Sequence, residues 1–304
     1  MNTFLYRTLA KWSGCRKQLS VSGQEREAAL SEFKKHQKAE IPYEMLEKQV
    51  IVRETMIESS RCVILSPMQG SPKKAVLYLY GGAFLRGPAM HDFKLAAFLA
   101  QETGRDVWFL LYPLFPDHLM HESAAAVLTC MKKMVKYYSP EKIAWFGFSS
   151  GASLCIYAWM MNRHEGMGIP IPNYMILNSP VLRVPCTDEE RQEMEKIPDI
   201  LIPPVFLSEE GLAGLMKERE EERHRYLADP LSYQMSYFPE TDLYFGTEEI
   251  AWIYLAPFLD QSFREHFTLH VHEGKGLWHC YGADDRTEIG KNTWKEYADL
   301  LKKH

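Results

Sequence analysis

Ser149 stands between two glycines in the run Gly147-Phe148-Ser149-Ser150-Gly151. An apolar stretch, residues 143–146, enters this pattern, and a proline-free stretch, residues 150–162, leaves it. A strand, a sharp turn and a helix in that order form the elbow that exposes a nucleophilic serine. Such a turn strains the serine backbone and needs glycine where strand and helix approach closely. We therefore predict that Ser149 is a nucleophile.

A serine hydroxyl is a poor nucleophile at neutral pH, so it needs a base within hydrogen-bond reach. Of the 11 histidines, His279 lies in a turn just beyond a C-terminal strand, whereas His270 and His272 alternate along that strand. Because sites in open α/β sheets form at the carboxyl ends of strands, His279 is the predicted base.

The base in turn needs a carboxylate that fixes its tautomer and stabilises its charged form. Two adjacent acids, Glu248 and Glu249, follow the predicted strand 242–245. Either places the acid between the serine and the histidine along the chain, the order typical of this elbow. The residues alone leave the choice between the two glutamates open.

A tetrahedral oxyanion needs backbone N–H donors that no side chain obstructs. Gly81 and Gly82 come directly after a strongly apolar strand and provide such backbone. The N–H of Ser150, next to the nucleophile, would be the third donor. Gly81, Gly82 and Ser150 are the predicted oxyanion hole.

Apolar runs and helical periodicity alternate along most of the chain. Strands are predicted at residues 45–53, 61–65, 74–80, 106–112, 143–146, 174–180, 242–245 and 267–272, and helices at 25–37, 91–104, 122–138, 150–162, 257–263 and 285–303. This alternation predicts an α/β fold with a mostly parallel central sheet and helices on both faces.

The alternation is interrupted once, and this interruption sets the domain organisation. Residues 185–237 contain proline clusters and a charge run, Lys217 to Arg225, and are interpreted as an inserted helical cap. The charge run is interpreted as a solvated helix face. The catalytic domain is then 45–184 with 238–304, preceded by a helical segment, 1–44.

Composition narrows the classes of partner. The net charge of -5 over 304 residues, with basic residues scattered among acids, argues against nucleic acid. Apolar runs fall far short of the roughly 20 residues that span a bilayer, and no cleavable signal is visible, so a cytoplasmic protein is expected. The six cysteines are spread apart and predict buried, reduced thiols. No metal or cofactor is expected, and homodimer formation stays open.

With these residues in place, the chain resembles the α/β-hydrolase superfamily, and more narrowly the hormone-sensitive-lipase-like esterases, over residues 73–302. Tyr80-Gly81-Gly82-Ala83-Phe84 resembles the His-Gly-Gly-Gly motif, residues 112–118 resemble Tyr-Arg-Leu-Ala-Pro-Glu-His, and 229–232 resemble the stretch that follows the cap. The chain departs from the family by Tyr80 in place of histidine, Ala83 in place of the third glycine, and glutamate in place of the usual aspartate.

The resemblance implies further properties. In the family a strand-end Gly-x-x-Asp carries the acid, and counting from Gly246 favours Glu249 over Glu248. It also implies an α/β-hydrolase fold in which the N-terminal helices and the 185–237 insertion jointly roof an acyl pocket.

The expected function is a serine hydrolase, a carboxylesterase that acts on small-molecule esters with short acyl chains. A deacetylase, amidase or peptidase with the same residues is the alternative, since pocket shape decides the leaving group. A non-catalytic binder is disfavoured because it has no need of Ser149, Glu249 and His279 in this order.

Overall fold

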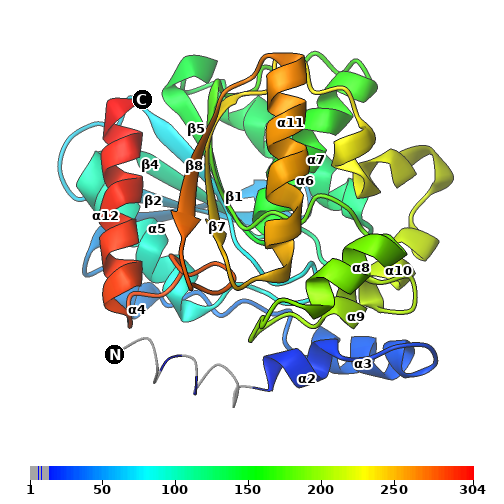
Figure 1. Ribbon diagram of the computed structural model, residues 1–304. Coiled ribbons are helices and arrows are strands. Elements are labelled where there is room, and N and C mark those ends of the chain that lie inside the picture. Colours follow the sequence, from blue (N-terminus) through cyan, green and yellow to red (C-terminus); the bar gives the residue numbers. More distant parts are fainter. Residues whose placement is uncertain (1–5, 7, 9–13) are drawn as a thin grey trace.

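The computed structural model describes residues 6, 8 and 14–304 (Figure 1). The part of the expected N-terminal helical segment at residues 1–5, 7 and 9–13 lies outside the described residues. One eight-stranded sheet, in the order β1-β2-β4-β3-β5-β6-β7-β8, forms the centre of the molecule. Its strands are β1 Val50–Ile57, β2 Ser60–Pro67, β3 Ala75–Leu79, β4 Asp106–Leu110, β5 Ile143–Phe148, β6 Tyr174–Asn178, β7 Glu240–Gly246 and β8 Leu269–Gly274.

The six strands β3 to β8 are parallel, and β1 and β2 join the edge antiparallel. The expected α/β fold with a mostly parallel sheet is therefore confirmed. The predicted start of the first strand at residue 45 is wrong, because residues Tyr43–Leu46 form a short helix, α4, and the strand begins at Val50. Over so short a run, the apolar residues Met45 and Leu46 fit the pattern of a helix as well as that of a strand.

Helices cover both faces of the sheet (Figure 1). One face carries α5 Met90–Thr103 and α12 Glu288–Lys303, which contact each other, and the other carries α6 Met120–Met134, α7 Ser150–His164 and α11 Leu255–Glu265. Because both faces are covered, the parallel strands can be apolar throughout, and β3, β4, β5 and β6 are buried at every residue. No helix in the described part of the chain has the length and apolar content to cross a membrane.

Five short helices gather beyond one end of the sheet (Figure 1). They are α2 Cys15–Leu19 and α3 Glu25–Lys34 from the N-terminal segment, and α8 Asp188–Glu195, α9 Pro204–Leu207 and α10 Leu212–Arg219 from the insertion. The charge run 217–225 is not a uniform solvated helix face as predicted. The helix ends at Arg219, and both Glu220 and His224 are buried. Periodicity could not reveal this, because their partners come from distant parts of the chain.

The connection between β5 and α7 is very tight. A Cβ at Gly147 would lie 2.7 Å from Cα of Ala152, and one at Gly151 would lie 2.2 Å from the carbonyl oxygen of Leu79 on β3. Both distances are shorter than any real Cβ contact, so only glycine lets α7 begin directly against β3 and β5. This packing fixes where residue 149 stands at the end of the sheet.

Replacement of Gly151 by alanine tests this constraint. Alanine favours a helix over glycine by about 1 kcal/mol, whereas overpacking against backbone costs about 1–3 kcal/mol. Because a Cβ at Gly151 would meet three backbone atoms at 2.2, 2.4 and 2.6 Å, we expect a cost at the upper end of this range. Gly151→Ala should then lower the free energy of unfolding by about 2 kcal/mol, measured by urea denaturation. Gly81→Ala is the matched control, since its Cβ would meet neighbours only at 3.3 Å, and we expect less than about 1 kcal/mol. Equal losses would contradict the proposed role of the close approach.

Candidate active site

The structure brings the three predicted residues Ser149, His279 and Glu249 into one line of contacts. Nε2 of His279 lies 2.8 Å from Oγ of Ser149, and Nδ1 of His279 lies 2.5 Å from Oε2 of Glu249. Ser149 follows β5, Glu249 follows β7 and His279 follows β8, so all three stand where parallel strands end. This is the arrangement of nucleophile, base and orienting acid in serine hydrolases.

Ser149 sits in a strained turn. Its backbone has φ 49° and ψ −119°, a region that residues with a side chain rarely adopt. Its N–H donates to the carbonyl of Asn178 at the end of β6, with an N–O distance of 2.8 Å. The turn therefore places Oγ beyond the sheet, where His279 can reach it.

Glu249 is fully buried and holds three hydrogen bonds. Oε1 accepts from the N–H of Gly246 at 2.7 Å and from the hydroxyl of Ser179 at 2.8 Å, and Oε2 faces His279. Burial raises the pKa of Glu249 above its ordinary value, and the hydrogen bonds act against that rise. The neighbouring Glu248 is half-buried and does not take part in this contact with His279. The geometry thus brings Glu249, not Glu248, to the imidazole of His279.

His279 is also buried, and its surroundings set its protonation. Burial by itself lowers the pKa of His279, but the neighbouring Cys280 and Glu249 raise it well above the usual value for histidine. The Glu249 contact also orients the ring, because Nδ1 points to the carboxylate and Nε2 points to Ser149. The imidazole is thereby held in the orientation that a base for Ser149 requires.

The predicted oxyanion residues lie beside the serine. Gly81 and Gly82 line the same cavity as Ser149, and a Cβ at Gly81 would stand 3.3 Å from Cβ of Ser149. Within the part of the chain that the structure describes, the backbone N–H groups of Gly81, Gly82 and Ser150 donate no hydrogen bond. These groups are thus free to meet a ligand at the serine.

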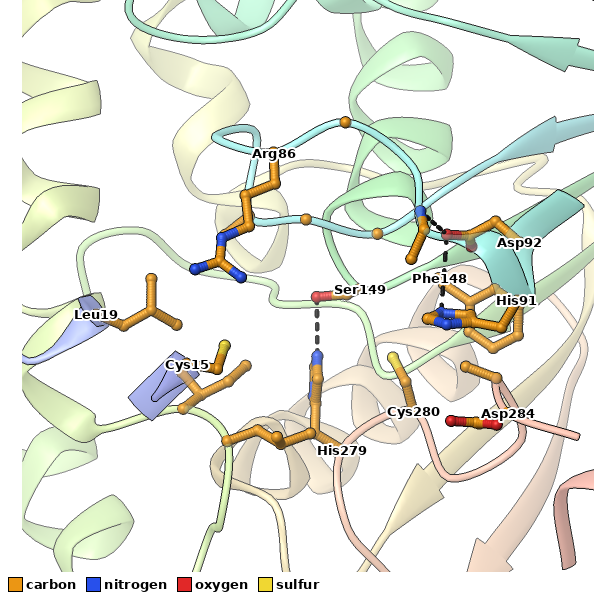
Figure 2. Close-up of a pocket in the computed structure, with 18 of the residues that line it drawn as sticks. Cys15, Leu19, Arg86, His91, Asp92, Phe148, Ser149, His279, Cys280 and Asp284 are labelled. Atoms are coloured by element: carbon orange, nitrogen blue, oxygen red, sulfur yellow. Dashed lines mark hydrogen bonds and ion pairs between the residues drawn. The ribbon is translucent and has the colours of Figure 1, made fainter. Parts of the chain in front are cut away.

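A cavity of about 270 Å³ opens at Ser149. Figure 2 shows Ser149 and His279 in direct contact among the residues that line it, with Cys15, Leu19 and Arg86 on one side and His91, Asp92, Cys280 and Asp284 on the other. None of the six cysteines forms a disulfide with another described residue, but Cys15 and Cys280 are only half-buried, so the prediction of buried thiols is wrong for these two. Nothing in their spacing could indicate that the fold brings them to one cavity.

Sequence reasoning missed two residues that position the acid. Ser179 donates to Glu249 and accepts from the N–H of Cys280 at 3.0 Å, so it links the acid loop to the histidine loop. Asp199 of the insertion is buried and accepts from the N–H of Ile250, next to Glu249, at 2.9 Å. The sequence could have indicated Ser179, because it comes just after a buried strand. Nothing in the sequence around Asp199 indicated a role at this site.

Among the residues that the structure describes, one group of three or more ligating side chains lies close enough to hold a metal ion, and it is not in this cavity. It consists of His121, Glu221 and His224. The Ser149 cavity therefore offers no comparable ligand set within the described residues.

Comparison with known proteins identifies the family of the chain. Residues 76–281 match the α/β hydrolase fold family, and the chain belongs to this family. It is 25% identical to an esterase of Acinetobacter venetianus strain RAG-1 over 224 residues, which cover 70% of this chain and 69% of the relative.

Solved structures share the fold. The hormone-sensitive-lipase homologue EstE7 from a metagenome library has a TM-score of 0.77 at 19% identity and covers 99% of this chain and 98% of its own. EstE5, studied after soaking with p-nitrophenyl butyrate, has a TM-score of 0.78 at 14% identity and covers 99% of this chain and 97% of its own. The resemblance expected from the sequence motifs is confirmed.

Substitution of the two glutamates tests the geometry. Glu249→Gln removes the charge that orients and stabilises the imidazolium, and we expect kcat for ester hydrolysis to fall by about 10³–10⁴-fold. Loss of this negative charge also lowers the pKa of His279, so the acidic limb of the kcat/KM profile should move to lower pH. Glu248→Gln is the control and should stay within about twofold of the unmodified chain. The reverse ranking would make Glu248 the acid.

Proposed function

We propose that this protein is a serine carboxylesterase that hydrolyses short-chain acyl esters through an acyl-enzyme intermediate. The main support for this activity is the continuous line of contacts from Oγ of Ser149 through His279 to the buried Glu249. Membership of the α/β hydrolase fold family and the likeness to an esterase support the same activity.

In the proposed reaction, Oγ of Ser149 attacks the ester carbonyl carbon while Nε2 of His279 accepts the hydroxyl proton. The bond to the alcohol oxygen then breaks, and His279 returns the proton to the leaving alkoxide. Water next attacks the acyl carbon with His279 again as base, and the bond to Oγ breaks to release the acid and restore the serine. Glu249 stabilises the imidazolium that forms in both halves.

The N–H groups of Gly81, Gly82 and Ser150 are proposed to hold the oxyanion. Each lacks a hydrogen-bond partner within the described residues. Gly81 and Gly82 line the cavity at Ser149, and Ser150 follows Ser149 in the chain. Donors fixed in this way need no rearrangement when the carbonyl oxygen becomes charged, and loss of one such donor in a hydrolase costs about 10²–10³-fold in kcat.

The N-terminal segment, 1–44, and the insertion, 185–237, are proposed to form the cap of the catalytic domain. Four described side chains of the first, Tyr6, Cys15, Leu19 and Phe33, line the cavity, and so do Leu201 and Ile202 of the second. Their mostly apolar character suits an acyl group.

Two observations support a preference for short acyl chains. The cavity, at about 270 Å³, lies below the range of roughly 300–1,000 Å³ that is usual for drug-sized ligands. The structurally similar EstE5 was soaked with a butyryl ester. A small soluble ester is therefore the proposed class of substrate.

Replacement of the nucleophile tests the proposed activity. Ser149→Ala should retain the fold by circular dichroism and lose p-nitrophenyl acetate and butyrate hydrolysis by at least about 10⁴-fold. Retention of more than a hundredth of the activity would exclude Ser149 as nucleophile. Absence of hydrolysis in the unmodified chain, with binding of esters retained, would favour a non-catalytic binder.

A series of esters tests the proposed chain length. Each additional methylene gains about 0.8 kcal/mol when it can be buried, so a long channel would favour longer acyl chains. We expect kcat/KM to peak between acetyl and butyryl esters and to fall at about eight carbons or more, because steric exclusion outweighs the added contact. Initial rates below the solubility limit measure this, and a maximum at decanoate or beyond would favour a lipase instead.

A further inference from the structure

A second cluster of titratable side chains lies outside the Ser149 cavity. His121 stands at the start of α6, and Glu221 and His224 belong to the insertion, where η2, a 3₁₀ helix, spans Glu222–Ala228. One ligand atom from each of these three residues lies within 4.8 Å of the others. His121 and His224 also line an open surface pocket of about 530 Å³, and their rings stack with centroids 4.1 Å apart.

A buried carboxylate holds one nitrogen of His121. Nδ1 of His121 lies 2.5 Å from Oε1 of Glu220, whose side chain has no exposed surface. The same carboxylate accepts from the backbone N–H groups of His121, at 3.2 Å, and Glu221, at 3.0 Å. Because Nδ1 faces this acceptor, Nε2 of His121 carries the free lone pair.

His224 has the complementary arrangement. Its Nε2 lies 3.2 Å from Oε1 of Glu165, at the end of α7, so its Nδ1 is the nitrogen left for another partner. This Nδ1 is buried, and it has no hydrogen-bond partner among the residues that the structure describes, although Oε2 of Glu221 lies 3.5 Å away.

We propose that Nε2 of His121, Nδ1 of His224 and a carboxylate oxygen of Glu221 bind a divalent transition-metal ion of the zinc class. Glu220 and Glu165 are the outer carboxylates that orient the two imidazoles, as acceptors usually do for histidine ligands. Two imidazoles and a carboxylate suit zinc better than magnesium or calcium, which prefer oxygen ligands throughout.

Geometry and charge both fit this ion. Nitrogen ligands of a tetrahedral zinc lie about 3.3 Å apart, and the three ligand atoms lie within 4.8 Å of one another. The two stacked rings, at an interplanar angle of 26°, must turn for their in-plane lone pairs to meet on one ion. Arg223 binds Oε2 of Glu221 at 2.8 Å and leaves Oε1 available. Since the arginine side chain is 75% exposed, it can also withdraw into solvent. The negative charge of the three carboxylates, Glu165, Glu220 and Glu221, exceeds the positive charge of Arg223.

The site would attach the insertion to the catalytic domain. His121 comes from α6 and Glu165 from the end of α7, whereas Glu220, Glu221 and His224 belong to the insertion. Ser149 is at the opposite end of the 15-residue helix α7, about 22 Å away along its axis. Bound metal should therefore raise stability and leave ester hydrolysis unchanged. Sequence analysis expected no metal because His121 is far from the other ligands along the chain.

Zinc titration of the chelator-treated chain tests the proposal. We expect one bound equivalent by equilibrium dialysis with metal analysis. A hundredfold excess over Kd should raise the melting temperature by roughly 3 °C or more. A chain that binds no zinc, or whose melting temperature does not rise, would overturn the site.

Variants identify the ligands. Glu221→Gln changes a half-exposed side chain and should fold normally. This variant and His224→Gln should each raise Kd for zinc by at least about tenfold. Glu220→Gln should raise Kd by about 10–100-fold, because His121 is then no longer held in the binding orientation. The control is His118→Gln, because His118 forms a similar pair with Glu122, at 3.3 Å, outside the cluster. Unchanged affinity in Glu221→Gln and His224→Gln would overturn the assignment.

Cobalt distinguishes this site from the thiols of the Ser149 cavity. Co²⁺ bound by nitrogen and oxygen should show visible d–d bands without a thiolate-to-cobalt charge-transfer band. A charge-transfer band together with inhibited ester hydrolysis would place the metal at Cys15 or Cys280 and refute the proposal. The zinc affinity, the melting temperature and the cobalt spectrum do not require the chain to be an esterase.

Discussion

The close approach of α7 to β3 and β5 is the constraint on which the Ser149 site depends. Gly147 and Gly151 permit it, because any side chain at either position would collide with backbone. α7 can then begin immediately after β5, and Ser149, the residue between them, belongs to neither element. Had the helix packed one side chain further away, Oγ of Ser149 would not reach the imidazole of His279, and the cavity would lack the proposed nucleophile.

The buried carboxylate of Glu249 depends on neighbours from several strand ends. An unpaired charge in such a place would cost several kcal/mol, and the protein offsets this with donors from Gly246, Ser179 and His279. Asp199 adds a contact from the insertion to the adjacent Ile250 N–H. The polar groups thus connect the loops after β6, β7 and β8 with the covering helices, so the position of the acid depends on the insertion as well as on the sheet.

Local patterns were sufficient to predict the alternating elements and the elbow at Ser149, because strand, turn and helix follow one another directly in the chain. The family motif, not periodicity, favoured Glu249 over Glu248, since adjacent residues differ only in orientation. Local sequence patterns could not predict that His224 is buried, because its partner Glu165 is distant in sequence. The catalytic roles themselves stay predictions until activity is measured.

The strained backbone at Ser149 has an evolutionary consequence. A residue with a side chain held at φ 49° costs about 1–3 kcal/mol, whereas glycine adopts this conformation almost freely. An inactive descendant with glycine at this position would be more stable than its active parent. Random drift under selection for stability alone would therefore remove the serine, so an active lineage keeps it only while hydrolysis itself is selected.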